Sequence, residues 1–153
     1  RLSDENTMTG IVNITGLPVK IAERIGSTIL DHLPEAVVHI QHAEKGHGQG
    51  VGVVLAATDG QTYLGGSTMG EKGKPAEKVG TEAAGNLISE IDGGGAVDIY
   101  ASDQLLPFLA LAGGSYTTRE LTGQSKANVD IIERFLGRTF NVEMGETVRF
   151  SKK

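Results

Sequence analysis

The chain has 153 residues, of which 39% are hydrophobic and 22% are charged, a composition typical of folded globular proteins. Its formal net charge of −5 excludes a protein whose whole surface attracts nucleic acid, so any RNA contact must be local. The chain has no cysteine, which excludes disulfides and thiolate metal sites. No apolar run is long enough for a bilayer, and the polar first residues do not resemble a secretory signal, so we expect a cytoplasmic protein without a membrane partner.

The first half of the chain alternates between strand and helix patterns. Strand patterns occupy residues 10–16, 36–42 and 51–68, the last as a pair of strands joined at Asp59 and Gly60. Amphipathic helix patterns occupy residues 18–33 and 75–91. The apolar side chains expected to face the core from these helices are Ile21, Ala22, Ile25, Ile29, Leu33, Val79, Ala83, Leu87 and Ile91.

The second half has a different order of elements. An apolar helix is predicted within residues 96–114, kinked or divided by Pro107. A strand pattern, a short helix and a hairpin follow over residues 115–121, 125–136 and 139–150. Ser125 is the expected N-cap of the short helix, with Val129, Ile132 and Leu136 facing inward and Gly137 just past its end.

This order of elements predicts the α+β class, with two small modules of helices packed on mixed or antiparallel sheets. The first module reads strand, helix, strands, helix, and the second reads helix, strand, helix, hairpin. Three glycines follow Asp92, so we place the junction there and expect modules at residues 10–92 and 93–153.

Two polar clusters lie in otherwise apolar surroundings. In a helix, Tyr100, Asp103 and Gln104 share one side, where an aromatic ring, a carboxylate and an amide are able to bind a base or a metal-bound phosphate. Gln124 immediately precedes the short helix, whose first amides are able to bind an anion. Both clusters also fit an ordinary helix start, in which acidic residues favour the dipole and a polar loop leads into a capped turn.

Three other motifs point more weakly to function. The loop at residues 46–50 is rich in glycine but lacks the Lys-Ser/Thr ending of a phosphate loop, so a strand connection is expected. The histidines at positions 32, 39, 42 and 47 lack the spacing of a zinc helix. The lysines at positions 72, 74 and 78 form a basic run diluted by glutamates, which suits a phosphate backbone or a solvated surface.

Three longer segments carry a family resemblance. The sequences GEKGKPAEKVGTEAAGNLISEI, AVDIYASDQLLPFLALAGG and LTGQSKANVDIIERFLG resemble RNA 3′-terminal phosphate cyclases in order and spacing. The similarity extends back through GLPVKIAER to about Gly10. It implies that the first module is the small inserted domain of that family, and that residues from about 93 onward form the carboxy-terminal part of its nucleotide-binding catalytic domain.

The resemblance also implies a reaction and its cofactors. The family uses ATP to convert an RNA 3′-phosphate into a 2′,3′-cyclic phosphate: an active-site histidine takes AMP and passes it to the phosphate, and the neighbouring 2′-hydroxyl displaces AMP. Tyr100, Asp103, Gln104 and Ser125 would then lie beside ATP or AMP, with Asp103 as a candidate ligand of Mg²⁺. RNA 3′ ends are the implied partners.

This sequence departs from the family at the nucleophile. Counting back from Asn128 places the histidine of the family at Gln124, whose amide nitrogen is delocalised and barely nucleophilic. We therefore expect a chain that binds nucleotide without being adenylated. Three accounts remain open: a cyclase with an inactivating change, a non-catalytic binding protein in RNA processing or ribosome assembly, and a stand-alone α+β module. A missing amino-terminal half or a second copy of the chain is a further expected partner.

Overall fold

The computed structural model describes residues 7–46 and 48–153. The chain divides into two compact units, one ending at Ser89 and the other running from Glu90 to Lys153, which we call the amino-terminal unit and the carboxy-terminal unit. Each contains helices and strands that follow one another along the chain, so the expected α+β class is confirmed. Within the described residues, no helix is both long enough and apolar enough to cross a membrane.

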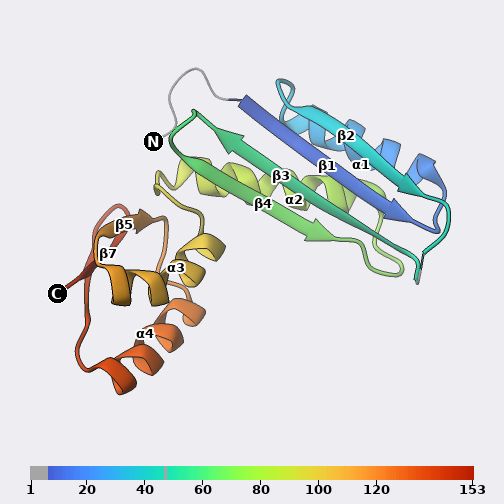
Figure 1. Cartoon of the computed structure of the whole chain (residues 1–153). Coiled ribbons are helices and arrows are strands. Elements are labelled where there is room, and N and C mark those ends of the chain that lie inside the picture. The colour runs from blue at the N-terminus through green and yellow to red at the C-terminus, as the bar shows by residue number, and fades with distance from the viewer. Residues whose placement is uncertain (1–6, 47) are drawn as a thin grey trace. The chain divides into compact units, whose positions relative to one another are not determined.

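The amino-terminal unit is a four-stranded sheet with helices on one face (Figure 1). Its elements are β1 (Thr7–Thr15), α1 (Val19–His32), β2 (Val37–Ala43), β3 (Gly50–Thr58), β4 (Tyr63–Met69) and α2 (Ala76–Asp92), the last turn of which enters the second unit. The strand order is β2-β1-β3-β4, in which β1 and β2 are parallel and the other pairs antiparallel. The mixed sheet follows from the chain, because α1 connects parallel strands and short loops connect the others.

The core of this unit lies between the sheet and the two helices. Alternate residues of β1 and β3 point into it, which is the period of a strand with one covered face. The glycine at position 66 lets α2 approach β4 closely, since a Cβ there would lie 2.5 Å from the backbone nitrogen of Leu87. The fully or almost fully buried apolar residues are Val12, Ile14, Ala22, Ile25, Ile29, Val53, Leu55, Ala57, Val79, Ala83, Ala84 and Leu87.

Two details of this unit differ from the sequence-based expectations. The strand pattern at residues 36–42 predicts a half-buried strand, but β2 lies at the sheet edge and Ile40 is 39% exposed. At the end of α2 the buried residue is Glu90, 3% exposed, whereas Ile91 is only half-buried. A charged side chain takes the inward position there because Arg119 pairs with it.

The carboxy-terminal unit packs two helices against a smaller sheet. Its remaining elements are α3 (Ile99–Ala112), β5 (Ser115–Thr118), α4 (Gly123–Leu136), β6 (Phe140–Met144) and β7 (Val148–Lys152). The strands are antiparallel in the order β5-β7-β6, and the expected hairpin is formed by β6 and β7. The core consists of Leu106, Leu109, Ala110, Phe140, Val148 and Phe150, with Tyr116, Leu121, Val129, Ile132 and Val142 packed at its margin.

Three predictions for this unit need correction. The helix predicted within residues 96–114 is formed as α3, and of the two alternatives for Pro107 the division into two pieces is wrong, because one helix runs through it. The N-cap of α4 is Thr122 rather than Ser125, so Gln124 lies in the first turn of the helix and not in the loop before it. Leu136 does not face inward, because it is 53% exposed at the last residue of α4.

Candidate nucleotide site

The carboxylate of Asp103 joins α3 to the start of α4. The hydroxyl of Ser125 donates a short hydrogen bond to Asp103 Oδ1, and the hydroxyl of Thr122 donates to the same oxygen over 3.1 Å. Asp103 is partly buried and Ser125 is fully buried. The two hydroxyl oxygens also lie 2.9 Å apart, so Asp103, Thr122 and Ser125 form one hydrogen-bonded group.

The first turn of α4 is fixed by the same residues. Thr122 Oγ1 accepts a hydrogen bond of 2.9 Å from the backbone N–H of Ser125, which is the side-chain to backbone bond of an N-cap. Thr122 Oγ1 therefore accepts a hydrogen bond from the helix backbone, and the Thr122 hydroxyl donates a hydrogen bond to Asp103. The start of α4 is held at a set position against α3, and the side chain of Gln124 projects from this fixed turn.

A proline explains a second link between the helices. Pro107 has no N–H, so the carbonyl of Asp103, four residues earlier, lacks its helical donor. The side-chain amide of Asn128 on α4 supplies that donor over 3.1 Å. The side-chain carbonyl oxygen of the same Asn128 accepts a hydrogen bond of 3.0 Å from Gln124 Nε2. The orientation of the Gln124 amide is thus connected through Asn128 to the backbone of α3.

Helix α3 also carries a stripe of exposed residues. Tyr100, Gln104, Phe108 and Leu111 follow one another at helical spacing, and all four are exposed, Tyr100 to 58%, Phe108 to 67% and Leu111 to 73%. Tyr100 and Gln104 therefore lie on solvent, whereas Asp103 is directed toward α4. The structure brings Asp103 and Ser125 together and joins Gln124 to Asp103 through Asn128. It shows no direct contact of Tyr100 or Gln104 with that group.

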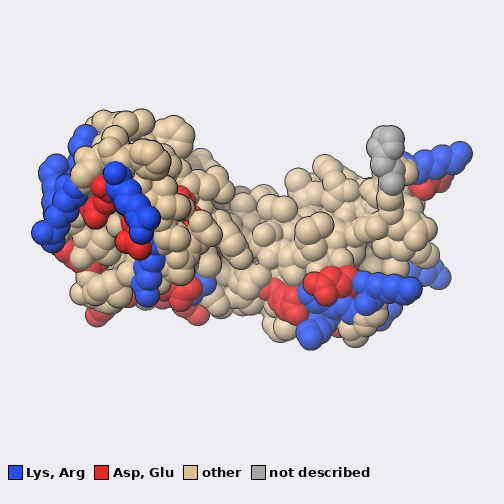
Figure 2. Space-filling model, turned by 90° about the horizontal axis from the view of Figure 1, so that it is seen from below, with Lys and Arg blue, Asp and Glu red and all other residues tan. Residues whose placement is uncertain are grey.

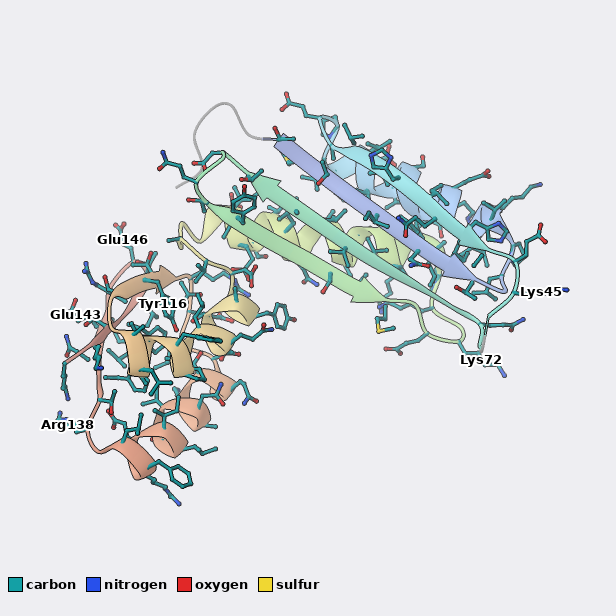
Figure 3. The ribbon with its side chains drawn as sticks, in the orientation of Figure 1. Lys45, Lys72, Tyr116, Arg138, Glu143 and Glu146 are labelled. Atoms are coloured by element: carbon teal, nitrogen blue, oxygen red, sulfur yellow. The ribbon has the colours of Figure 1, made fainter. Side chains whose placement is uncertain are left out.

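A buried ion pair near the start of this unit was not predicted from the sequence. Arg119 Nε donates 2.8 Å to Glu90 Oε1, and burial raises the pKa of the Glu90 carboxyl despite that partner. Nearby, the Tyr116 hydroxyl donates 2.7 Å to the Ser102 carbonyl, and burial raises the pKa of Tyr116 (Figure 3). The two partners of the ion pair are 29 residues apart, so no local pattern pointed to them.

The described residues do not contain a group of three or more acidic or histidine side chains able to enclose a metal ion. Asp103 is a single carboxylate, engaged by two hydroxyls. Among the histidines, His32 lies within 3.3 Å of the Thr81 hydroxyl, and His47 lies outside the described residues. A magnesium ion at Asp103 would take its other ligands from phosphate oxygens and water, which is the common pattern for that ion.

The geometry suits binding more than covalent chemistry. An aromatic ring and an amide on the exposed stripe of α3 are able to contact a base, and the first turn of α4 presents backbone N–H groups to an anion. The group at position 124 is an amide, which donates and accepts hydrogen bonds but is a poor nucleophile. These residues therefore form a candidate nucleotide site without a nucleophile at Gln124.

Comparison with known proteins identifies relatives of the chain. A family model described as the RNA 3′-terminal phosphate cyclase insert domain matches residues 6–92. The RNA 3′-terminal phosphate cyclase of Thermococcus gammatolerans is 42% identical over 90% of this chain and 41% of its own length. That of Thermococcus kodakarensis is 41% identical over 88% of the chain and 40% of its own length.

A third relative, the cyclase of Methanothermobacter thermautotrophicus, is 38% identical over 92% of the chain and 43% of its own length. The chain thus spans about two fifths of the length of the curated relatives it matches. Because they cover 88–92% of the chain, these matches extend over both units. The chain belongs to the RNA 3′-terminal phosphate cyclase family, with residues 6–92 matching its insert domain.

Proposed function

We propose that the chain contributes the insert domain and part of the nucleotide site to a protein of the cyclase type. Such a protein converts an RNA 3′-phosphate into a 2′,3′-cyclic phosphate with ATP, and RNA 3′ ends are its partners. The observation that carries the proposal is the fixed first turn of α4, held by Asp103, Thr122 and Ser125 and presenting position 124. In this chain Gln124 stands there, so we further propose that the chain itself is not adenylated.

The roles of the side chains follow from their contacts. Tyr100 and Gln104 would contact the base of ATP, and the free amides of the first turn of α4 would contact a phosphate. Asp103 would hold that turn through Ser125, and its Oδ2, 3.4 Å from the Thr122 hydroxyl, would be one ligand of a magnesium ion. Magnesium would neutralise phosphate charge there.

Labelling with ATP that carries ³²P at the α-phosphate tests this proposal. The chain would be used alone and together with the portion of the T. gammatolerans cyclase that it does not match. We expect no labelled protein in either case. With that portion present, Gln124→His should produce an acid-labile label, because imidazole attacks the α-phosphate, whereas Gln124→Asn should not. A label on the unaltered chain, or none on the Gln124→His variant, would contradict the assignment of position 124.

A second candidate function is RNA binding without catalysis. The hydrogen bond of Gln124 to Asn128 favours it, because the amide is ordered as a binding group while the nucleophile is absent. Binding of an RNA with a 3′-phosphate should weaken as salt rises from 50 to 200 mM if phosphate contacts contribute, and an RNA with a 3′-hydroxyl should bind less tightly. Salt-independent binding, or none, would favour a module without an RNA function.

The exposed stripe of α3 also bears on partners. Phe108 and Leu111 are large apolar side chains one turn apart on this stripe, and both are more than 60% exposed. We propose that this surface packs against the remaining part of a cyclase nucleotide-binding domain. Addition of the unmatched portion of the T. gammatolerans cyclase should therefore give a complex in analytical ultracentrifugation, and Phe108→Ser should weaken it. The same sedimentation coefficient with and without that portion would contradict the proposal.

A further inference from the structure

The amino-terminal unit has a cavity of about 500 Å³ at one end of its sheet. It lies between α1, α2, the start of β3 and the loop that connects β4 to α2. Its lining residues are Leu17, Ile21, Ile25, Gln49, Gly50, Val51, Gly70, Glu71, Lys72, Gly73, Lys74, Ala76 and Val79. The volume falls within the range of about 300–1,000 Å³ that is usual for small-molecule sites. No residue of the candidate nucleotide site on α3 and α4 takes part.

The walls of the cavity are aliphatic. Ile25 and Val79 are fully buried beneath its floor, Val51 closes the side formed by β3, and Leu17 and Ile21, both half-buried, present apolar surface to it. Branched aliphatic side chains make a flat apolar surface of the kind on which a planar ring packs. The amide of Gln49 lies at the rim and forms no hydrogen bond with any other described residue. It is therefore available to pair with a polar edge, because an amide both donates and accepts.

The mouth of the cavity is basic. The loop from Gly70 to Lys74 turns at Gly73, whose φ of +86° favours glycine, and it carries two lysines and one carboxylate, Glu71. Lys74 is committed to an ion pair with Glu82, but Lys72 has no hydrogen-bond or ion-pair partner among the described residues. Figure 3 shows Lys72 on this loop, at the same end of the sheet as Lys45.

The charge around the mouth extends onto α2. A shallower hollow shares the loop and adds Lys78, so three lysines lie within seven residues of sequence. Figure 2 shows Lys and Arg side chains interleaved with acidic ones on this unit. The acidic residues Glu77 and Glu82 are already paired, with Arg24 and Lys74, which leaves Lys72 as the cation best placed to meet an added anion.

We propose that this cavity is a second nucleotide site, which takes a nucleoside phosphate. The base packs on the apolar surface of Leu17 and Ile21, the amide of Gln49 pairs with the base edge, and the phosphate meets Lys72 at the mouth. An aliphatic ligand would leave the amide of Gln49 without a use, and a bare phosphate would leave the apolar walls empty. A base joined to a phosphate uses all three features.

Two sources supply this chemistry, a free mononucleotide and a nucleotide within an RNA strand. The site lies outside the unit that carries Gln124, so it does not depend on the proposed cyclase chemistry. Loss or gain of adenylation at position 124 should leave binding in the cavity unchanged. The two proposals therefore fail separately.

Residue-resolved NMR of the full chain tests the site. AMP should shift the amide signals of Gly70, Gly73 and Val79 in a saturable manner, and adenosine or inorganic phosphate alone should bind more weakly. Lys72→Gln should weaken AMP binding at these signals roughly tenfold, the value of one charge-assisted hydrogen bond. Lys20→Gln is the matched control, because Lys20 is exposed on α1 and does not line the cavity.

A second variant tests the apolar part of the site. Ala76→Leu places a larger side chain in the cavity and should reduce AMP binding, while amide signals distant from the cavity report that the unit remains folded. A 5′-phosphorylated tetra-adenylate RNA separates the sources: shifts with both ligands support a mononucleotide site, and shifts with the RNA alone support a site for a nucleotide of a strand. Absence of shifts with both, or equal affinity of the Lys72→Gln and Lys20→Gln variants, would overturn the proposal.

Discussion

The link between Pro107 and Asn128 gives a prediction that depends on the tertiary structure. Pro107 deprives the carbonyl of Asp103 of its helical hydrogen bond, and Asn128 replaces it from α4 over 3.1 Å. Asn128→Ala removes the replacement and leaves a partly buried carbonyl without a donor. A net hydrogen bond contributes about 0.5–1.5 kcal/mol and an unsatisfied group costs about 1–3 kcal/mol, so we expect the partly exposed site to lose about 1–2 kcal/mol.

A double-mutant cycle isolates this effect. Pro107→Ala restores a backbone N–H at a solvent-exposed position of α3, and that N–H is able to bond the Asp103 carbonyl. In the Pro107→Ala background, Asn128→Ala should therefore cost about 1 kcal/mol less than in the unaltered chain. Because the chain has two units, a single unfolding midpoint does not report on one of them.

Native-state hydrogen exchange measures the stability of the carboxy-terminal unit separately. The free energy of opening would be obtained from the amides of α3 and α4, which belong to the carboxy-terminal unit. Asp130→Ala is the control, since Asp130 is exposed on α4 and should change stability by less than about 0.5 kcal/mol. If the effects of Pro107→Ala and Asn128→Ala simply add, Asn128 does not replace the missing helical donor and the reasoning is refuted.

Two further predictions concern buried or bound carboxylates. Arg119→Gln leaves Glu90 buried without its partner and should cost about 3 kcal/mol at pH 7. Burial raises the folded pKa of Glu90 above 4.5, and removal of Arg119 raises it further, so the loss should shrink as pH falls through these raised values and be gone by about pH 4.5. Adding Glu90→Gln should recover most of the loss, and a pH-independent loss in hydrogen exchange of the carboxy-terminal unit would argue against this. Glu133 accepts hydrogen bonds of 2.9 Å from the N–H groups of Thr139 and Phe140, which lower its pKa. Its contribution should be present above pH 4.5 and be lost as pH falls through the lowered pKa, so Glu133→Ala should destabilise the chain by about 1–2 kcal/mol at pH 7 and progressively less as pH falls below 4.5 in the same measurement.

Much of the local structure follows from the sequence alone. Helical spacing placed Tyr100 and Gln104 together on one side of α3, and it identified Ile25 and Ile29 as core residues of α1. These features depend on residues within four positions of one another, and local patterns report them. The family resemblance added the expectation that position 124 corresponds to the nucleophile of the family, which no spacing rule supplies.

The tertiary structure decided the features that depend on distant residues. Thr122 and Ser125 both suit an N-cap, and the choice of Thr122 accompanies the hydrogen bonds of both hydroxyls to Asp103, about twenty residues earlier in the sequence. Glu90 is buried because Arg119 reaches it from the end of β5. Local sequence therefore determined which segments become helices and strands, whereas the burial of polar groups was set by partners that only the folded chain brings within hydrogen-bonding distance.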